Sequence, residues 1–121
     1  MVANLANSSY AGLAEQNIIV PLTYAGTLGF SLSTSSTAIL PVSPQRRSVT
    51  FHNPGTQIIY VCQAADMNGN ALTPGPNAGN FSIYPGATWT FNGNGVAGAW
   101  LAAAAANTGN PFTVASNQDA P

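Results

Sequence analysis

Apolar and polar positions alternate over short stretches in the middle of the chain, most clearly within Arg46–Gln63. Residues 49–52 alternate with a period of two, which is typical of a β-strand. The segment Asn-Pro-Gly-Thr at 53–56 then interrupts the pattern, because proline followed by glycine suits a tight turn. β-Branched and aromatic residues follow at 58–62. The pattern predicts two strands joined as a hairpin, with their apolar sides at the centre of a core.

The same signals recur along the chain. Pro21 cannot donate to a strand ladder, so the first of these strands, Ile18–Tyr24, is expected at a sheet edge, or the proline marks a strand end. Ala25-Gly26-Thr27 is expected to interrupt the strand pattern. About eight short strands separated by turns predict an all-β antiparallel sandwich or barrel. Besides the hairpin, the expected strands are Ile18–Tyr24, Leu28–Leu32, Ala38–Val42, Phe81–Tyr84, Thr88–Phe91 and Phe112–Val114.

The stretch Gly98–Ala106 allows two interpretations. Five consecutive alanines favour a helix by propensity. A helix of nine residues would be marginal on its own, and the neighbouring segments have strand and turn patterns. We therefore expect a strand, entered through a hairpin turn at Asn92–Gly95, whose asparagines and glycines tolerate positive φ.

The ends of the chain differ in composition from its middle. Residues 1–17 are small and polar, and we interpret them as an arm that docks on a partner through Leu5, Tyr10 and Leu13; the alternative is a frayed terminus. Residues 18–115 form the expected sandwich domain, and 116–121 form a polar tail. The segment Ala64–Gly79 is rich in turn formers and predicts a long loop, and such loops are often functional.

Charge is scarce in this sequence. Charged residues make up 4% of the 121 residues and the net charge is −1, whereas about 25% is typical of soluble domains. Two arginines cannot form a basic surface, so nucleic-acid and anionic-membrane binding are not expected. Either Ser, Thr, Asn and Gln solvate the surface, or much of it is buried in a permanent assembly. The N-terminus has neither a positive segment nor an apolar run, so no signal peptide is expected.

The inventory of reactive residues argues against catalysis and metal binding. His52, Cys62 and Asp66 are the internal residues that could act as ligands, and three carboxylates occur in the whole chain. Two cross-strand neighbours such as His52 and Cys62 do not make a metal site. Glycines 93, 95 and 98 have the spacing of a dinucleotide-binding loop, but no strand–helix unit surrounds them. We therefore expect no enzyme, metal site or cofactor.

The best candidates for function are interface residues. Arg46 and Arg47 are the one local concentration of charge, and arginine is enriched at interface cores. The alternative is that they solvate the start of a strand. Trp89 and Trp100 are either core residues or anchors for a partner or a sugar. With Leu5, Tyr10 and Leu13 they complete the expected partner interface.

The segments R-R-S-V-T-F-H-N-P-G-T-x-I-I-Y-V and F-S-I-Y-P-G-A-T-W-T-F, within Arg46–Phe91, are similar to segments of small phage structural proteins. With the scarcity of charge and the polar arm, the chain resembles the decoration, or cementing, proteins of tailed-bacteriophage capsids. The resemblance implies a jelly-roll-like sandwich on the outer surface of the virion. Its partners would be the major capsid protein and further copies of itself, as a dimer or trimer. The alternative function is a carbohydrate- or receptor-binding module of a tail fibre or spike.

Overall fold

The computed structural model describes residues 23–119 of the chain. The expected arm, with Leu5, Tyr10 and Leu13, lies outside the described residues. The elements within the described range are β2 (Thr23–Leu32), β3 (Thr37–Leu40), β4 (Arg46–His52), β5 (Ile59–Gln63), β6 (Phe81–Ile83), β7 (Thr88–Asn92), the 3₁₀ helix η1 (Asn94–Ala97), β8 (Trp100–Ala104) and β9 (Asn110–Asp119).

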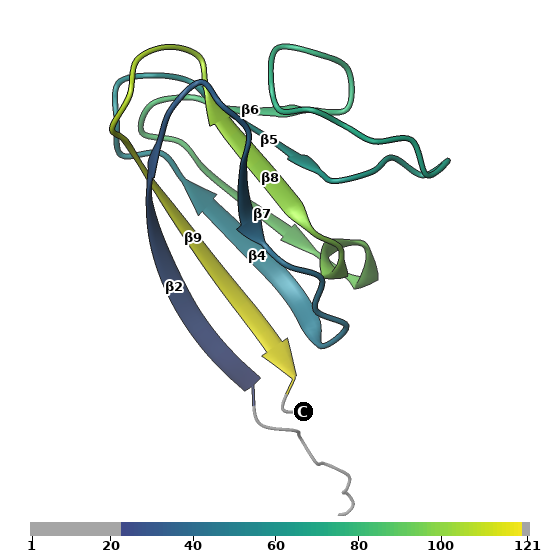
Figure 1. The fold of residues 1–121 in the computed structure, drawn as a ribbon. Coiled ribbons are helices and arrows are strands. Elements are labelled where there is room, and N and C mark those ends of the chain that lie inside the picture. The colour runs from purple at the N-terminus through teal and green to yellow at the C-terminus, as the bar shows by residue number, and fades with distance from the viewer. Residues whose placement is uncertain (1–22, 120–121) are drawn as a thin grey trace, which may run out of the picture.

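These strands form two antiparallel sheets that face each other as a sandwich (Figure 1). One sheet has the order β2-β9-β4-β7 and the other β3-β8-β5-β6. The pairs are nested along the chain, because β2 pairs with β9, β3 with β8, β4 with β7 and β5 with β6. This nesting is the connectivity of a jelly roll. The prediction of an all-β antiparallel sandwich is confirmed, and its jelly-roll form with it.

The predicted hairpin within Arg46–Gln63 is wrong in its pairing. Both strands exist, but β4 belongs to one sheet and β5 to the other, so the segment between them crosses the sandwich. Asn53 makes the crossing possible. Its side chain is fully buried, donates to the carbonyls of Gln57 and Ile83 at 2.7 and 2.8 Å, and accepts from the Gly55 amide at 3.0 Å. These bonds replace the strand ladder that a hairpin would have supplied.

The turn expected at Asn92–Gly95 is also not a hairpin. Gly93 has φ 98°, as the glycine-rich sequence suggested, but the chain then forms η1 and passes from β7 in one sheet to β8 in the other. β8 itself confirms the strand interpretation of the alanine-rich stretch. It lies between β3 and β5, and its buried alanines pack in the interior, so pairing on both edges overrides helix propensity.

Two strand boundaries move outward from those expected. β2 runs without interruption through Ala25-Gly26-Thr27, and β9 continues through residues 116–119, which were assigned to the polar tail. The two segments pair with each other in continuous register from Thr23–Asp119 to Leu32–Asn110. Because each supplies the ladder for the other, small and polar residues remain in strands despite weak propensity.

The core lies between the inner faces of the two sheets. As predicted, Val49 and Phe51 are at its centre, and both are completely buried together with Ile59 and Val61. The ring of Phe51 lies 5.2–5.9 Å from three other aromatic rings, those of Phe91, Trp100 and Phe112. Burial of this apolar area is the main stabilising contribution to the sandwich.

Candidate functional site

The edge strands β6 and β7 carry aromatic side chains on one open side of the sandwich. Trp89 and Phe91 stand opposite the buried residues Phe51 and Val49 on β4, so they face inward. Phe81 on β6 stands opposite the buried Val61 and faces inward from the other sheet. The ring centroid of Phe81 lies 4.7 Å from that of Phe91 and 6.3 Å from that of Trp89.

These inward-facing rings nevertheless reach the surface. Trp89 is 42% exposed and Phe81 38%. Both strands are the last in their sheets, and no further strand of the described residues covers them on this side. Phe91 links the exposed pair to the core, since its ring centroid lies 5.5 Å from that of Trp100 and 5.9 Å from that of Phe51. The aromatic cluster is therefore continuous from the core to solvent.

A groove of about 440 Å³ opens beside this cluster. Its floor is Phe91, Val96 and Trp100, and its walls come from Phe81 and the segment 65–79. The rim carries a few polar groups, including Gln63, whose side-chain amide donates to the Gly95 carbonyl. The full lining is Gln63, Ala65, Asp66, Met67, Leu72, Gly79, Phe81, Phe91, Asn92, Gly95, Val96 and Trp100. An apolar floor with a sparse polar rim suits an apolar side chain or segment.

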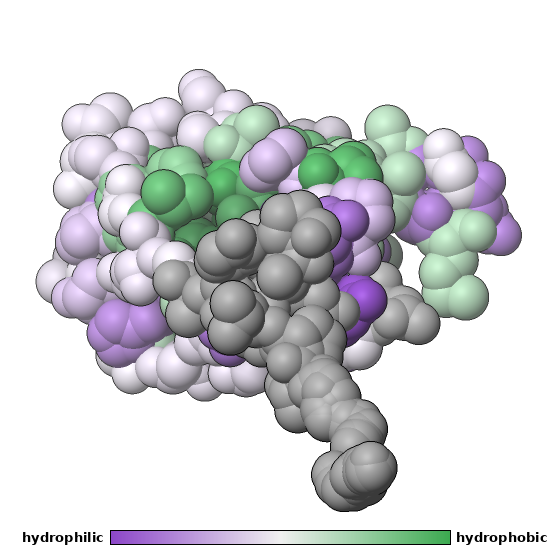
Figure 2. Space-filling model, turned by 90° about the horizontal axis from the view of Figure 1, so that it is seen from below, coloured by the Kyte–Doolittle hydropathy of each residue, from purple (hydrophilic) through white to green (hydrophobic). Residues whose placement is uncertain are grey.

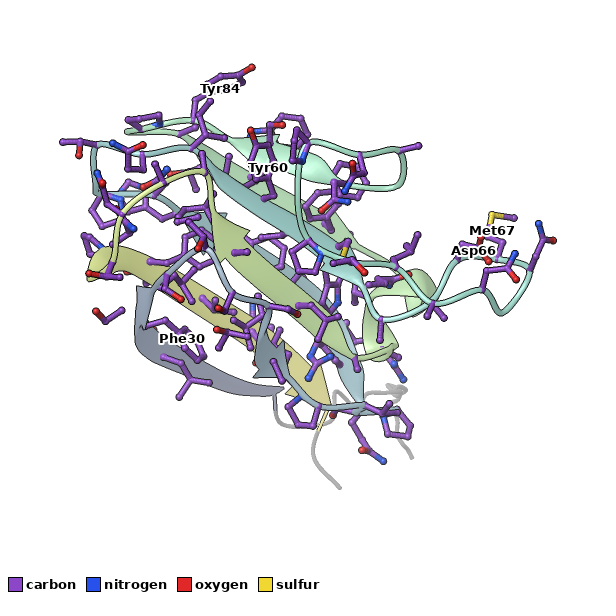
Figure 3. The ribbon with its side chains drawn as sticks, turned by 45° about the horizontal axis from the view of Figure 1, so that its top comes forward. Phe30, Tyr60, Asp66, Met67 and Tyr84 are labelled. Atoms are coloured by element: carbon purple, nitrogen blue, oxygen red, sulfur yellow. The ribbon has the colours of Figure 1, made fainter. Side chains whose placement is uncertain are left out.

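The tip of the long loop forms the outer wall of the groove. The Asp66 carboxylate accepts from the backbone amides of Asn70 and Asn68, each at 2.9 Å, and these bonds lower the pKa of Asp66. Met67 is completely exposed beside it. Figure 3 shows Asp66 and Met67 projecting from the body of the domain, on the side away from Phe30. An exposed methionine on a stiffened loop tip is well placed to contact a partner.

Within residues 23–119, no strand pairs with the outer backbone edge of β7. Gly93 donates to Arg47, and Asn53 donates to Ala87, in register with the β4–β7 ladder. Odd-numbered residues from 87 to 93 therefore bond to β4. By alternation, the amides and carbonyls of Thr88, Thr90 and Asn92 point away from the sheet. Their three side chains are exposed as well.

Arg46 lies inside the domain. It is 2% exposed, and its guanidinium donates to the carbonyls of Pro41, Gly98 and Val96 at 2.8, 3.0 and 3.1 Å. Burial lowers the pKa of this guanidinium. Its Nε has no hydrogen-bond partner among the described residues. Arg46 therefore joins three chain segments within the domain, and its burial leaves little of its side chain exposed for the expected partner contact.

The other candidate interface residues are likewise divided into exposed and buried ones. Arg47 is exposed and donates to the Pro44 and Arg46 carbonyls. Trp100 is 2% exposed and its indole donates to the Val96 carbonyl, so it supports the groove from below. Trp89 alone of the two tryptophans is accessible. Sequence reasoning missed Phe81 and Phe91, although strand alternation could have placed them on inner faces. It indicated Leu72 and Met67 only through the long loop Ala64–Gly79 that contains them.

The groups considered for chemistry are dispersed. The His52 ring bonds through Nδ1 to the Thr88 hydroxyl at 2.8 Å on the outer face of the β4 sheet, whereas Cys62 lies in the other sheet. Cys62 is completely buried, and burial raises the pKa of its thiol. No cluster of three or more His, Cys, Asp or Glu side chains that could hold a metal occurs within residues 23–119. The same range contains no helix long and apolar enough to cross a membrane.

Apolar surface is also exposed away from the groove. Leu28 is 50% exposed and Val42 66%. Viewed from below, apolar side chains reach the exterior of the domain beside polar ones (Figure 2). The groove differs from this surface because its rings are continuous with the core.

No protein-family model and no curated protein matches the sequence. Among solved structures, the fold is similar to that of a chain from Bacillus endospore appendages, described as a novel family of disulfide-linked pili. The TM-score is 0.56 and the identity 9%, over 83% of this chain and 88% of that one. At this identity the likeness concerns the fold alone. A chain of the cyanophage Pam1 capsid asymmetric unit matches with a TM-score of 0.38 and 18% identity, over 98% and 100% of the two chains. The second score is too low to carry an argument.

Proposed function

We propose that the protein is a non-enzymatic structural component of a virion, which binds the outer surface of a capsid and cements neighbouring major capsid subunits. The observation that carries the proposal is the aromatic groove beside the free edge of β7. Exposed Phe81 lines an apolar groove that reaches Trp100, and exposed Trp89 lies beside it in the same aromatic cluster. This surface has the anatomy of a protein interface, with an aromatic centre and a polar border.

The charge inventory supports an assembly role. With charged residues at 4% of the chain, docking desolvates few ions, so a permanent contact forms without a large electrostatic penalty. The jelly roll is a fold that builds viral capsids among other structures. The Bacillus appendage subunit with the same architecture belongs to a pilus linked by disulfides. In this chain Cys62 is the single cysteine and is buried, so the proposed contacts are non-covalent.

The test is reconstitution of particles from which this protein has been stripped. Wild-type protein should restore resistance of the shell to heat and chaotrope. Trp89→Ala and Phe81→Ser should restore less, because they remove the two exposed rings of the aromatic cluster at the groove. Tyr84→Ala is the matched control: Tyr84 is 58% exposed but belongs neither to that cluster nor to the lining of the groove. Shells that are equally stable with and without the protein would refute the cementing function.

A second candidate, a carbohydrate-binding module of a tail fibre or spike, is favoured by one observation. The exposed ring of Trp89 is stacked at 26° to that of Phe91, and such rings can pack against the apolar face of a sugar. The asparagines near the groove could supply hydrogen bonds. A glycan array probed with the wild-type protein and with Trp89→Ala separates the two functions. Specific binding that Trp89→Ala abolishes would favour the module.

A further inference from the structure

We propose that the free edge of β7 and its aromatic groove bind residues Ile18–Leu22 of a second copy of the chain, which add a fifth strand, parallel to β7, to the β2-β9-β4-β7 sheet. This inference rests on the proposed function in taking the groove as an assembly interface. It identifies the occupant of the groove and makes this contact a self-association.

The acceptor side is complete in the described structure. Thr88, Thr90 and Asn92 direct their backbone N–H and C=O groups outward along an edge that has no neighbouring strand in the described part of the chain. The side chains of Trp89 and Phe91 face the space between the sheets. There they meet Phe81, which comes from β6, the edge strand of the other sheet. A strand added here gains ladder hydrogen bonds from the threonines and an apolar surface for its inward side chains.

The donor has a sequence suited to this edge. Ile18-Ile19-Val20-Pro21-Leu22 is apolar and rich in β-branched residues, and it directly precedes β2. Pro21 has no N–H, so it must occupy a position whose amide would point away from β7. The backbone groups that bond to β7 are then those of the even-numbered residues, Ile18, Val20 and Leu22. Pro21 at the outer edge also opposes the addition of a sixth strand.

The position of Pro21 also determines whether the added strand runs parallel or antiparallel to β7. Thr90 points its side chain to the outer face, where its hydroxyl lies 2.9 Å from that of Thr50. In an antiparallel pair, residues that bond to Thr90 would share the outer face with it, which would expose Ile18, Val20 and Leu22. In a parallel pair, the side chains of the residues that bond to Thr90 lie on the face opposite to the Thr90 side chain, so they point inward. Parallel pairing therefore places all three aliphatic side chains over the aromatic groove.

Geometry excludes the chain's own segment as the occupant. Residue 22 adjoins Thr23, which begins β2 at one edge of the sheet, and β7 forms the other edge. The vacant position beyond β7 is four strand spacings from β2, about 19 Å at about 4.8 Å each. Leu22 lies within about 4 Å of Thr23, so it cannot reach that position. The donor must be another copy, in a head-to-tail contact that closes into a ring or continues as a chain.

The proposal is tested on the full-length protein by sedimentation velocity over a range of concentrations. Val20→Asp places a carboxylate over the aromatic groove and should weaken self-association roughly a hundredfold. Ile19→Asp is the matched control, because residue 19 would point to the outer face and should change association little. On the acceptor, Thr90→Pro removes the outward N–H and should weaken association at least about tenfold, whereas Thr90→Val keeps it.

Circular dichroism establishes that each variant retains the wild-type fold, which is expected because the Thr90 amide does not bond to β4. A wild-type protein that stays monomeric, unchanged association of Val20→Asp, or equal losses from Val20→Asp and Ile19→Asp would each overturn the inference. The proposed function fails separately, in the reconstitution experiment. If Trp89→Ala no longer protects shells while Val20→Asp associates normally, the groove binds the capsid and this occupant is wrong.

Discussion

Replacement of Arg46 by methionine should destabilise the domain, whereas the same replacement of its exposed neighbour Arg47 should not. Methionine fills much of the same volume but cannot donate hydrogen bonds. Three carbonyls lose their guanidinium donor. The Val96 carbonyl keeps a bond from the Trp100 indole at 3.2 Å, so the loss falls mainly on Pro41 and Gly98.

The expected size follows from those two acceptors. The bonds to Pro41 and Gly98 are only partly buried. A buried polar group left without its partner costs about 1–3 kcal/mol, and partial solvation puts each of these carbonyls near the lower end, so the two together cost about 2 kcal/mol. For a domain of this size, unfolding should occur roughly 8 °C lower. The assay is thermal and urea unfolding followed by circular dichroism. Arg47→Met is the matched control, and since Arg47 is exposed, it should cost less than about 1 kcal/mol. Equal stability of the two variants would refute a structural role for Arg46.

Three further predictions concern individual residues outside the groove floor. Asn53→Ala should cost about 3 kcal/mol in urea unfolding, because a fully buried side chain with three hydrogen bonds is lost. Asn80→Ala, which removes similar bonds at a partly exposed turn, should cost about 1 kcal/mol. Cys62 should react with a thiol reagent only as fast as the protein unfolds, and rapid labelling of native protein would contradict this. Because burial raises the pKa of its thiol, the contribution of Cys62 to stability should be present below the unfolded pKa of about 8.5 and decline as pH rises. Asp66 has a lowered pKa, so the order of its loop should persist above about pH 4 and be lost as pH falls further, which amide exchange at Asn68 and Asn70 would detect.

The sequence located strands well because alternation reports which side of a strand is buried, and burial is common to every sandwich. Val49, Phe51 and Ile59 were predictable as core residues for this reason. Pairing was less predictable. Asn-Pro-Gly-Thr at 53–56 has the composition of a hairpin turn, but a buried asparagine can satisfy an arch between two sheets equally well. Gly55 does not have the positive φ that a type II turn requires at its third position, so the composition favoured a turn that the chain does not form.

The sequence allowed us to predict an interface of aromatic and arginine side chains, but only some of the residues that form the candidate site. Arg46 and Arg47 are neighbours in sequence, yet strand alternation points them to opposite environments, one inside and one exposed. Trp89 and Trp100 differ because one lies on an edge strand and the other on a central one. Position within a sheet depends on long-range pairing. The groove combines Phe81 and Phe91 from different sheets, so its existence depends on that pairing too.

The edges of the two sheets indicate why β7 is the better acceptor. Exposed edges favour uncontrolled strand addition, and proteins usually shorten, bend or charge them. β6 has three residues, and β3 has four with an irregular register. β7 has five residues, Thr-Trp-Thr-Phe-Asn, with neither charge nor proline. Its aromatic side chains, exposed Trp89 and partly buried Phe91, face inward. β2 is longer, but Gly26 and Gly29 weaken its propensity for pairing. An edge with this composition, in a chain with so few charges, is best explained by a partner strand that covers it in the assembled protein.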